Sequence, residues 1–289
     1  MHSPSTPWLP KLVVAPSFIV GLLFIYGLIA WNGWLSLSAS RLLPNYEFVG
    51  LEQYVTLFEN ERFHVALKNM AIFGTLFIGG AMAVGLLLAV LLDQKIRAEG
   101  ALRTIYLYPM AISFIVTGTA WKWILNPGLG LEHLMHQWGF TGFSFGWLVD
   151  PDMAIYCVAI AGVWQSAGFV MALFLAGLRG IDDSIIKAAQ IDGASLPRIY
   201  WRIVIPSLRP VFFSTLMVVS HLAIKSFDLV MALTAGGPGY ATDLPATFMY
   251  AMAFSRGQIG LGAASATVML ATVAAIVVPY LYSELRGRK

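Results

Sequence analysis

The chain has 289 residues, of which 58% are hydrophobic and only 11% are charged, with a formal net charge of +3 at pH 7 and a mean hydropathy of +0.74. A soluble domain carries about a quarter charged residues to cover its surface, so this composition excludes a water-facing globular protein and indicates a lipid bilayer. No dense basic patch is present, which argues against a nucleic-acid partner.

Six stretches are long and apolar enough to cross a bilayer, which takes about 20 residues of helix. They are Val13–Leu37, Met70–Leu92, Ile105–Leu125, Ala154–Leu178, Val211–Leu233 and Gly262–Tyr282. The first is too long for a signal-peptide core and lacks a small-residue cleavage pattern, so we expect it to be retained. The sequence therefore predicts an all-α membrane protein with about six transmembrane helices, forming a single domain over residues 1–289.

The distribution of Lys and Arg predicts the orientation, because cytoplasmic loops carry an excess of both. One side holds Lys11, Lys95, Arg97, Arg103, Arg179, Lys187, Arg198, Arg202, Arg209, Arg286, Arg288 and Lys289. The other holds only Arg41, Arg62, Lys68, Lys225 and Arg256, and Lys122 is ambiguous. Both termini are therefore expected in the cytoplasm, as an even number of spans requires. The aromatic-rich loop 126–152 has no Lys or Arg and is expected outside.

Signatures of an energy source or an enzyme are lacking. A phosphate-binding loop needs Gly-Lys followed by Ser or Thr, and no Gly-Lys pair occurs. Ion-coupled carriers usually bury several carboxylates, whereas Asp228 is the only one inside the six stretches. His133 and His136 lie near Glu132, but a zinc site needs three or four ligands, and a solvated histidine pair is the favoured interpretation. We predict no catalytic residue, no metal and no cofactor in this chain.

The loop between the fourth and fifth stretches, about residues 180–210, predicts two short helices. Asp182 or Asp183 caps a helix that begins at Ser184 or just after, and Gly193 ends it. A second helix begins after Ser195 and tolerates Pro197 in its first turn. Pro206 is expected to end this second helix. The result is two helices joined by a glycine turn on the cytoplasmic face.

This loop resembles the cytoplasmic coupling loop of bacterial ATP-binding-cassette (ABC) importer permeases. The family pattern is Glu-Ala-Ala, then three residues ending in Asp-Gly-Ala, then an apolar stretch that closes on a proline. The matching residues are Ala188, Ala189, Asp192, Gly193, Ala194 and Pro206. One position departs from the pattern, because Lys187 stands where the family has a glutamate that pairs with a basic residue of the ATPase. The resemblance implies that Lys187 and the five matching residues from Ala188 to Ala194 contact an ATPase.

A second resemblance narrows the class. Phe227-Asp228-Leu229 and Leu233-Thr234-Ala235-Gly236-Gly237-Pro238 look like the signature of the first of two paired sugar permeases. Trp121 with Asn126–Gly130, and Trp164 through Leu178, match other parts of that subfamily. The run Lys225-Ser226-Phe227-Asp228 further looks like permeases of glucose or mannose importers.

The resemblance implies a set of partners. These are a second homologous permease, two copies of an ABC ATPase that binds ATP and Mg²⁺, and a periplasmic sugar-binding protein. It also implies a location in the bacterial inner membrane. Closure of the ATPases on ATP is expected to push the turn at Gly193 and rock the spans between inward- and outward-facing states.

Related maltose permeases bind substrate with the spans that flank the loop. The matching positions are Gly162, Gln165, Ser166 and Phe169 before the loop, and Val219, Leu222, Ala223 and Ser226 after it. Gln165 and Ser166 offer hydrogen bonds to sugar hydroxyls, and Phe169 offers a ring face.

The span after the loop holds charged and titratable residues that are further candidates for the substrate path, in addition to Ser226. They are His221, Lys225 and Asp228, and charges inside a span are functional candidates by default. For Lys225 and Asp228, an intrahelical salt bridge at the outer membrane edge is an equally good interpretation.

Two classes of function remain open besides the importer subunit. One is a self-contained secondary carrier or channel for a small polar solute. The other is a membrane enzyme that uses Asp228 and His221.

Overall fold

The computed structural model describes residues 8–43, 45–94 and 96–287, and within these ranges it is almost entirely helical. Lys95, Arg288 and Lys289, which entered the charge count, lie outside the described residues. Contacts group the chain into two compact units, one of residues 8–60 with Phe248–Ala271 and one of Glu61–Thr247 with residues 272–287. The single domain predicted for residues 1–289 stays a prediction.

The first unit holds α1 (Leu9–Ser36), α2 (Glu52–Glu59), the π-helical turn η3 (Ala251–Ser255) and the beginning of α14 (Ile259–Gly287). The Asn32 amide of α1 donates to the Ala263 carbonyl at 3.2 Å and to the Thr267 hydroxyl at 3.0 Å, which joins α1 to α14. Most of the apolar side chains of α1 are otherwise exposed, as expected of a helix whose neighbours are lipid tails or another subunit.

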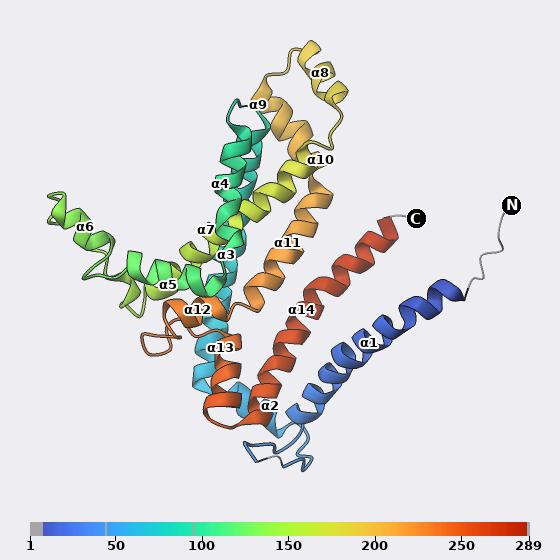
Figure 1. Ribbon diagram of the computed structural model, residues 1–289, viewed down its shortest axis with the longest axis vertical. Coiled ribbons are helices and arrows are strands. Elements are labelled where there is room, and N and C mark those ends of the chain that lie inside the picture. The colour runs from blue at the N-terminus through green and yellow to red at the C-terminus, as the bar shows by residue number, and fades with distance from the viewer. Residues whose placement is uncertain (1–7, 44, 95, 288–289) are drawn as a thin grey trace. The chain divides into compact units, whose positions relative to one another are not determined.

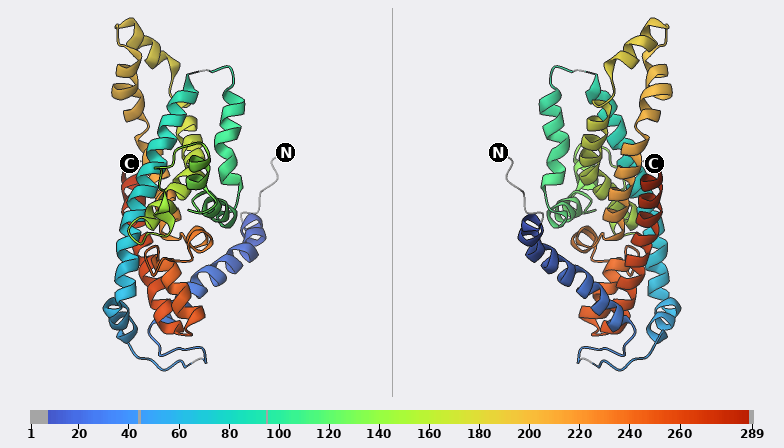
Figure 2. Two further views of the ribbon diagram at one scale, coloured as in Figure 1. Left: turned by 90° about the vertical axis from the view of Figure 1, so that its left-hand side faces the viewer. Right: turned by 90° about the vertical axis from the view of Figure 1, so that its right-hand side faces the viewer.

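The second unit is built on α3 (Glu61–Asp93) and α7 (Ala154–Leu178), which pack against each other along their length. A Cβ on Gly80 would lie 2.7 Å from the Val163 side chain, and one on Gly85 would lie 2.5 Å from that of Val170. Small residues thus let the two backbones approach closely, as is common between membrane helices. Figures 1 and 2 show α3 as the longest helix of this unit.

Several shorter helices complete the second unit. They are α4 (Glu99–Ala111), α5 (Phe114–Ile124), α6 (Leu131–Gln137), η1 (Gly146–Leu148), α8 (Asp183–Ile191), α9 (Leu196–Ile199), η2 (Tyr200–Val204), α10 (Ile205–Ser207), α11 (Arg209–Ile224) and α12 (Asp228–Leu233). The helix α13 (Pro245–Tyr250) begins in this unit. By length and composition, four helices are able to cross a membrane, or up to six if each of two bent pairs is one span. The predicted all-α membrane fold is confirmed.

The third predicted span, Ile105–Leu125, is not one straight helix. It divides into α4 and α5, which meet at an angle of 99°. Pro109 lies in the last turn of α4, and Ser113 caps α5 by accepting a hydrogen bond from the Val116 N–H at 3.3 Å. A proline followed by an N-cap residue is a strong signal for a helix break, and the hydrophobicity of the stretch hides it.

The fifth predicted span, Val211–Leu233, also breaks. Helix α11 ends at Ile224, and α12 begins at Asp228 and packs against α5. Gly118 makes this packing possible, since a Cβ there would lie 2.7 Å from the Ala232 side chain. Irregular backbone at membrane depth is tolerated only where protein buries it or where it lines a cavity. Both breaks are therefore informative about function.

The second loop helix ends at Ser207, one residue beyond the predicted end at Pro206. Helical structure continues from Leu196 to Ser207 and bends by 65° only before Arg209. The π-helical turn η2 precedes the proline, and within it the Ile205 N–H donates to the Tyr200 carbonyl. Pro206 follows this π-helical turn and is the second-last residue of the helical run.

Candidate coupling site and substrate path

Helices α8 and α9 lie at one end of the second unit, beyond the ends of α3, α4 and α7 (Figure 1). The predicted start of α8 is confirmed, since the Asp182 carboxylate accepts a hydrogen bond from the Ser184 N–H at 2.8 Å. The hydrogen bond from this backbone amide lowers the pKa of Asp182, because it favours the charged carboxylate.

The turn at Gly193 joins the two helices. Gly193 has a φ of +76°, a left-handed conformation that only glycine adopts without strain. Its N–H donates to the Gln190 carbonyl at 3.0 Å, and the next N–H, of Ala194, donates to the Ala189 carbonyl at 3.0 Å. These bonds close the end of α8 and fix the angle at which the chain turns into α9.

Helix α8 has two distinct faces. Asp183, Ile186, Lys187 and Gln190 recur at helical spacing and line a cavity between α8 and the rest of the unit. The other face exposes Ile185, Ala188 and Ile191, of which Ile191 is 86% exposed. The residue at the family's glutamate position, Lys187, therefore lines the inner cavity, whereas Ala188 faces outward.

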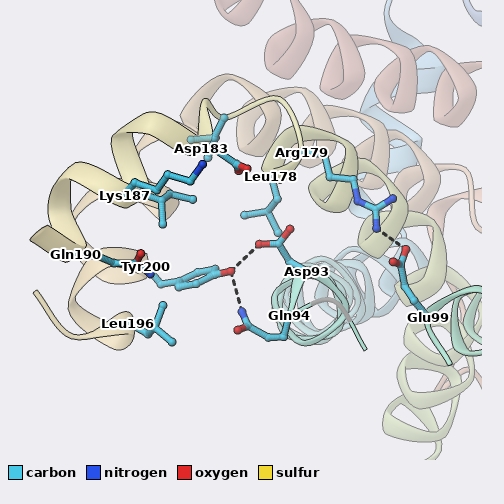
Figure 3. Close-up of a pocket in the computed structure, with 12 residues that line it drawn as sticks. Asp93, Gln94, Glu99, Leu178, Arg179, Asp183, Lys187, Gln190, Leu196 and Tyr200 are labelled. Atoms are coloured by element: carbon cyan, nitrogen blue, oxygen red, sulfur yellow. Dashed lines mark hydrogen bonds and ion pairs between the residues drawn. The ribbon is translucent and has the colours of Figure 1, made fainter. Parts of the chain in front are cut away.

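The cavity has a volume of about 590 Å³ and is bounded by the ends of three helices (Figure 3). Asp93 and Gln94 come from the end of α3, Glu99 from the first turn of α4, and Arg179 from the end of α7. In Figure 3 the Lys187 side chain extends toward Asp183 along α8. The loop that contains α8 and α9 therefore covers a polar cavity.

Tyr200 bridges this space on one side. Its hydroxyl donates to the Asp93 carboxylate at 2.5 Å and accepts from the Gln94 amide at 2.7 Å. An ion pair between Arg179 and Glu99 ties the end of α7 to the start of α4 on another side. Both charges of this pair also face favourable helix ends, a cation at a C-terminus and an anion at an N-terminus. Hydrogen bonds of Tyr200 therefore join the loop to the end of α3.

The first set of predicted path residues lies in α7. Gln165 and Ser166 are buried and Phe169 is half-buried. The Gln165 amide donates to the Ile112 carbonyl at 2.7 Å, a group that the break between α4 and α5 leaves without a helical partner. The Gln165 carbonyl oxygen has no partner among the described residues. The Gln165 side chain therefore provides a hydrogen-bond donor for the backbone carbonyl at the break in the third span. Its own carbonyl oxygen remains available as an acceptor.

The second set lies at the break after α11. Lys225 follows the last helical residue, Asp228 begins α12, and both are exposed, as is His221. The buried Ser226 hydroxyl donates to the Leu222 carbonyl at 2.9 Å. Lys225 and Asp228 do not share one helix, and in the described part of the chain no ion pair joins them. The interpretation as an intrahelical salt bridge is therefore wrong.

Helix α7, which carries the first set of path residues, contacts α12, which begins with Asp228 of the second set. A Cβ on Gly162 of α7 would lie 2.8 Å from the Phe77 ring of α3 and 3.4 Å from the Leu229 side chain of α12. Helices α4, α5, α11 and α12 all pack against α7, and Gln165 itself donates to Ile112 at the first break. In transporters, broken helices of this kind commonly form the substrate site.

The sequence analysis missed an ion pair at the loop after α12. The Arg62 guanidinium donates to the Asp243 carboxylate at 2.5 Å and lies over the Tyr240 ring at 4.3 Å. Asp243 is 1% exposed and also accepts from the Thr247 hydroxyl at 2.6 Å. Gly236, in the Gly-Gly-Pro signature, has a φ of +86° and a Cβ position 3.1 Å from the Asp243 carboxylate. The signature therefore shapes a loop around a buried ion pair.

The residues weighed as metal ligands have other roles. The Glu132 carboxylate accepts from the Phe145 N–H at 2.8 Å, and the His136 ring contacts the Phe143 carbonyl at 2.7 Å. The His133 ring lies 3.0 Å from the Gln137 amide. Among the described residues no group of three His, Cys, Asp or Glu side chains is arranged to hold a metal ion.

Comparison with known proteins identifies relatives along the whole chain. A probable ABC transporter permease of Pyrococcus horikoshii is 39% identical over 100% of this chain and 99% of its own length. A xylose/arabinose import permease of Haloferax volcanii is 34% identical, with coverage of 93% and 86%. An sn-glycerol-3-phosphate permease of Pectobacterium atrosepticum is 30% identical, with coverage of 94% and 92%.

The fold matches that of a solved importer. A chain of a bacterial ABC transporter that imports the acidic polysaccharide alginate superposes with a TM-score of 0.85 and 22% identity, covering 98% of this chain and 96% of that one. Residues 81–287 match the family model described as the inner membrane component of binding-protein-dependent transport systems. With four to six apolar segments able to cross a membrane among its described residues, this chain is a multi-pass membrane protein that belongs to that family of ABC transporter permeases.

Proposed function

We propose that this chain is the sugar-translocating permease of an ABC importer in the cytoplasmic membrane, powered by ATP hydrolysis in a partner subunit. The membership in the permease family and a relative named for xylose and arabinose import support this proposal. The chain itself binds neither ATP nor Mg²⁺ in this proposal, and both belong to the ATPase.

The observation that carries the proposal is the outward face of α8. An apolar face with Ile185, Ala188 and Ile191 exposed is costly in water and suits burial against a protein partner. The Gly193 turn holds this face at the end of the spans, and Tyr200 connects it to α3. An ATPase that pushes on α8 would therefore move α3 and its neighbours.

The charge on α8 suggests how the ATPase contact differs from the family pattern. Lys187 lines the inner cavity beside Asp183, so in this chain the position of the family glutamate is turned away from the outward face. Ala188, Asp192, Gly193 and Ala194 remain the proposed contact residues, whereas the predicted contact Ala189 is buried within the chain. A basic residue of the ATPase would meet Asp182 in place of a glutamate, because Asp183 lines the inner cavity with Lys187.

The proposed assembly contains a second homologous permease, two copies of the ATPase and a periplasmic sugar-binding protein. An alginate transporter with a similar fold forms a complex with its periplasmic protein, and the family is defined by its dependence on a binding protein. Both termini face the cytoplasm in this assembly, as the Lys and Arg distribution predicts.

A monosaccharide is the proposed substrate, with glucose or mannose the first to test. The specific choice rests on the run Lys225-Ser226-Phe227-Asp228, and the relatives are named for other solutes. Gln165, Ser166, Phe169, Ser226, Lys225, Asp228 and His221 are the proposed path residues. The unused acceptor of Gln165 and the break at Lys225 support their placement.

Purification and reconstitution test the proposal. The chain is expected to purify with an ATPase and a second permease, and vesicles containing that complex should take up radiolabelled sugar only with ATP inside and binding protein outside. Uptake by vesicles that contain this chain alone would instead establish a self-contained carrier or channel.

A further inference from the structure

Asn69 is a buried residue of α3 that belongs neither to the coupling site nor to the proposed path residues. It is 6% exposed, and its amide donates to the Tyr240 carbonyl at 3.1 Å and to the Asp243 carbonyl at 3.0 Å. Both carbonyls belong to the loop that follows α12. The ion pair of Arg62 with the Asp243 side chain joins the same helix to the same loop. The loop after α12 is therefore held to α3 by its backbone and by a side chain.

Hydrogen bonds within the loop extend this attachment to α12 itself. The Thr242 hydroxyl lies 2.7 Å from the hydroxyl of Thr234, the residue after the last one of α12, and 2.9 Å from the Gly237 carbonyl oxygen. Thr242 and Asp243 are 0% and 1% exposed. The residue that is bonded across the loop to the end of α12 thus directly precedes the residue that is bonded to α3.

Helix α12 bears on the second half of the proposed substrate path. It begins at Asp228, just after the break that holds Lys225. It packs against α5, where a Cβ on Gly118 would lie 2.7 Å from the Ala232 side chain. A displacement of α12 would therefore move the segment that carries Asp228 and change its packing on the broken third span.

Helix α3 connects this attachment to the coupling loop. It is one continuous helix of 33 residues without a proline, the commonest cause of a sharp kink. Asn69 and Asp93 are about 36 Å apart along it at 1.5 Å per residue. At the Asp93 end the Tyr200 hydroxyl donates to the carboxylate, and Figure 1 shows α8 and α12 well separated within this unit. Both the coupling loop and the loop after α12 are thus hydrogen-bonded to one helix.

We propose that Asn69 is a positioning residue through which α3 carries the movement of the coupling loop to α12. The inference rests on the proposed function, because it says how a push by the ATPase would reach the second half of the path. The Arg62–Asp243 ion pair stabilises the same attachment. A connection of this kind is established by a measured coupling between its two ends.

The test is a double-mutant cycle on the whole transporter in proteoliposomes, measured as the number of ATP molecules hydrolysed for each sugar imported. Asn69→Ala is expected to raise this number about threefold, because two hydrogen bonds to the loop are lost and α12 no longer follows α3. Substitutions this far apart normally act independently, so that their effects multiply. The double variant Asn69→Ala/Tyr200→Phe is instead expected to raise the number no further than the larger single change, since both substitutions break one connection.

Gln53→Ala is the matched control. The Gln53 amide also donates to a backbone carbonyl, that of Ser38 at 3.1 Å, but it lies in the first unit. This variant should leave the ATP-to-sugar number unchanged. If Asn69→Ala does not fold, Asn69→Ser, which keeps one hydrogen-bond donor, takes its place in the cycle.

The outcomes separate the inference from the proposed function. Effects of Asn69 and Tyr200 that multiply would overturn the inference, and so would a wild-type ATP-to-sugar number in the Asn69 variant. A variant that loses ATP hydrolysis and transport in equal proportion would show a merely structural role, which also overturns it. Absence of ATP-dependent sugar uptake by the wild-type transporter would overturn the proposed function instead.

Discussion

Substitution Tyr200→Phe tests whether the coupling loop drives α3. The change removes one hydroxyl, which donates to Asp93 at 2.5 Å and accepts from Gln94 at 2.7 Å, and leaves the ring in place. A hydrogen bond to a charged group contributes about 1.5–3 kcal/mol. Because Tyr200 and Asp93 are only half-buried, the lower end applies, about 1.5 kcal/mol, or roughly tenfold in an equilibrium constant.

The assay is the number of ATP molecules hydrolysed for each sugar imported into proteoliposomes. The substitution should leave assembly with the ATPase intact, because Tyr200 is not part of the outward face of α8. Transport is expected to fall several-fold while ATP hydrolysis persists, since the loop would move without α3. A purely structural loss would instead lower both rates together.

Tyr108→Phe provides the matched control. Tyr108 is 65% exposed, and its hydroxyl makes no hydrogen bond among the described residues. An unchanged ATP-to-sugar ratio in Tyr200→Phe would refute the mechanical connection through Asp93.

Three further predictions concern the loop turn, the buried ion pair and the path. Gly193→Pro should abolish transport-coupled ATP hydrolysis while binding-protein docking persists, because proline excludes the φ of +76° and removes the hydrogen bond to Gln190; normal coupled hydrolysis would contradict the role of the turn. Asp243→Ala should lower the free energy of unfolding by about 3 kcal/mol by removing the buried carboxylate that accepts hydrogen bonds from Arg62 and Thr247, measured by thermal unfolding in detergent against the exposed control Asp152→Ala. Gln165→Ala and Lys225→Ala should each reduce sugar uptake in vesicles, and wild-type rates for both would exclude the proposed path.

Much of the fold could be predicted because hydrophobicity and capping are local properties. The sequence predicts the fourth span at Ala154–Leu178, and the structure has the same bounds, since nothing interrupts its apolar run. Asp182 and Gly193 marked the ends of α8 for equally local reasons, a side-chain cap and a left-handed turn. These end signals made the bounds of α8 predictable from the sequence.

The tertiary structure decided what local patterns leave open. The breaks near Ile112 and Lys225 lie inside apolar runs, and they are tolerated because α7 and a second broken helix bury or satisfy the freed backbone groups. The orientation of Lys187 toward a cavity depends on α3, α4 and α7 meeting beneath α8. The ion pair of Arg62 with Asp243 joins residues far apart in sequence. Composition alone indicates that this chain is a membrane protein. Which of its polar groups contact one another depends on the packing of segments that are distant in the sequence, because only the tertiary structure brings those side chains together.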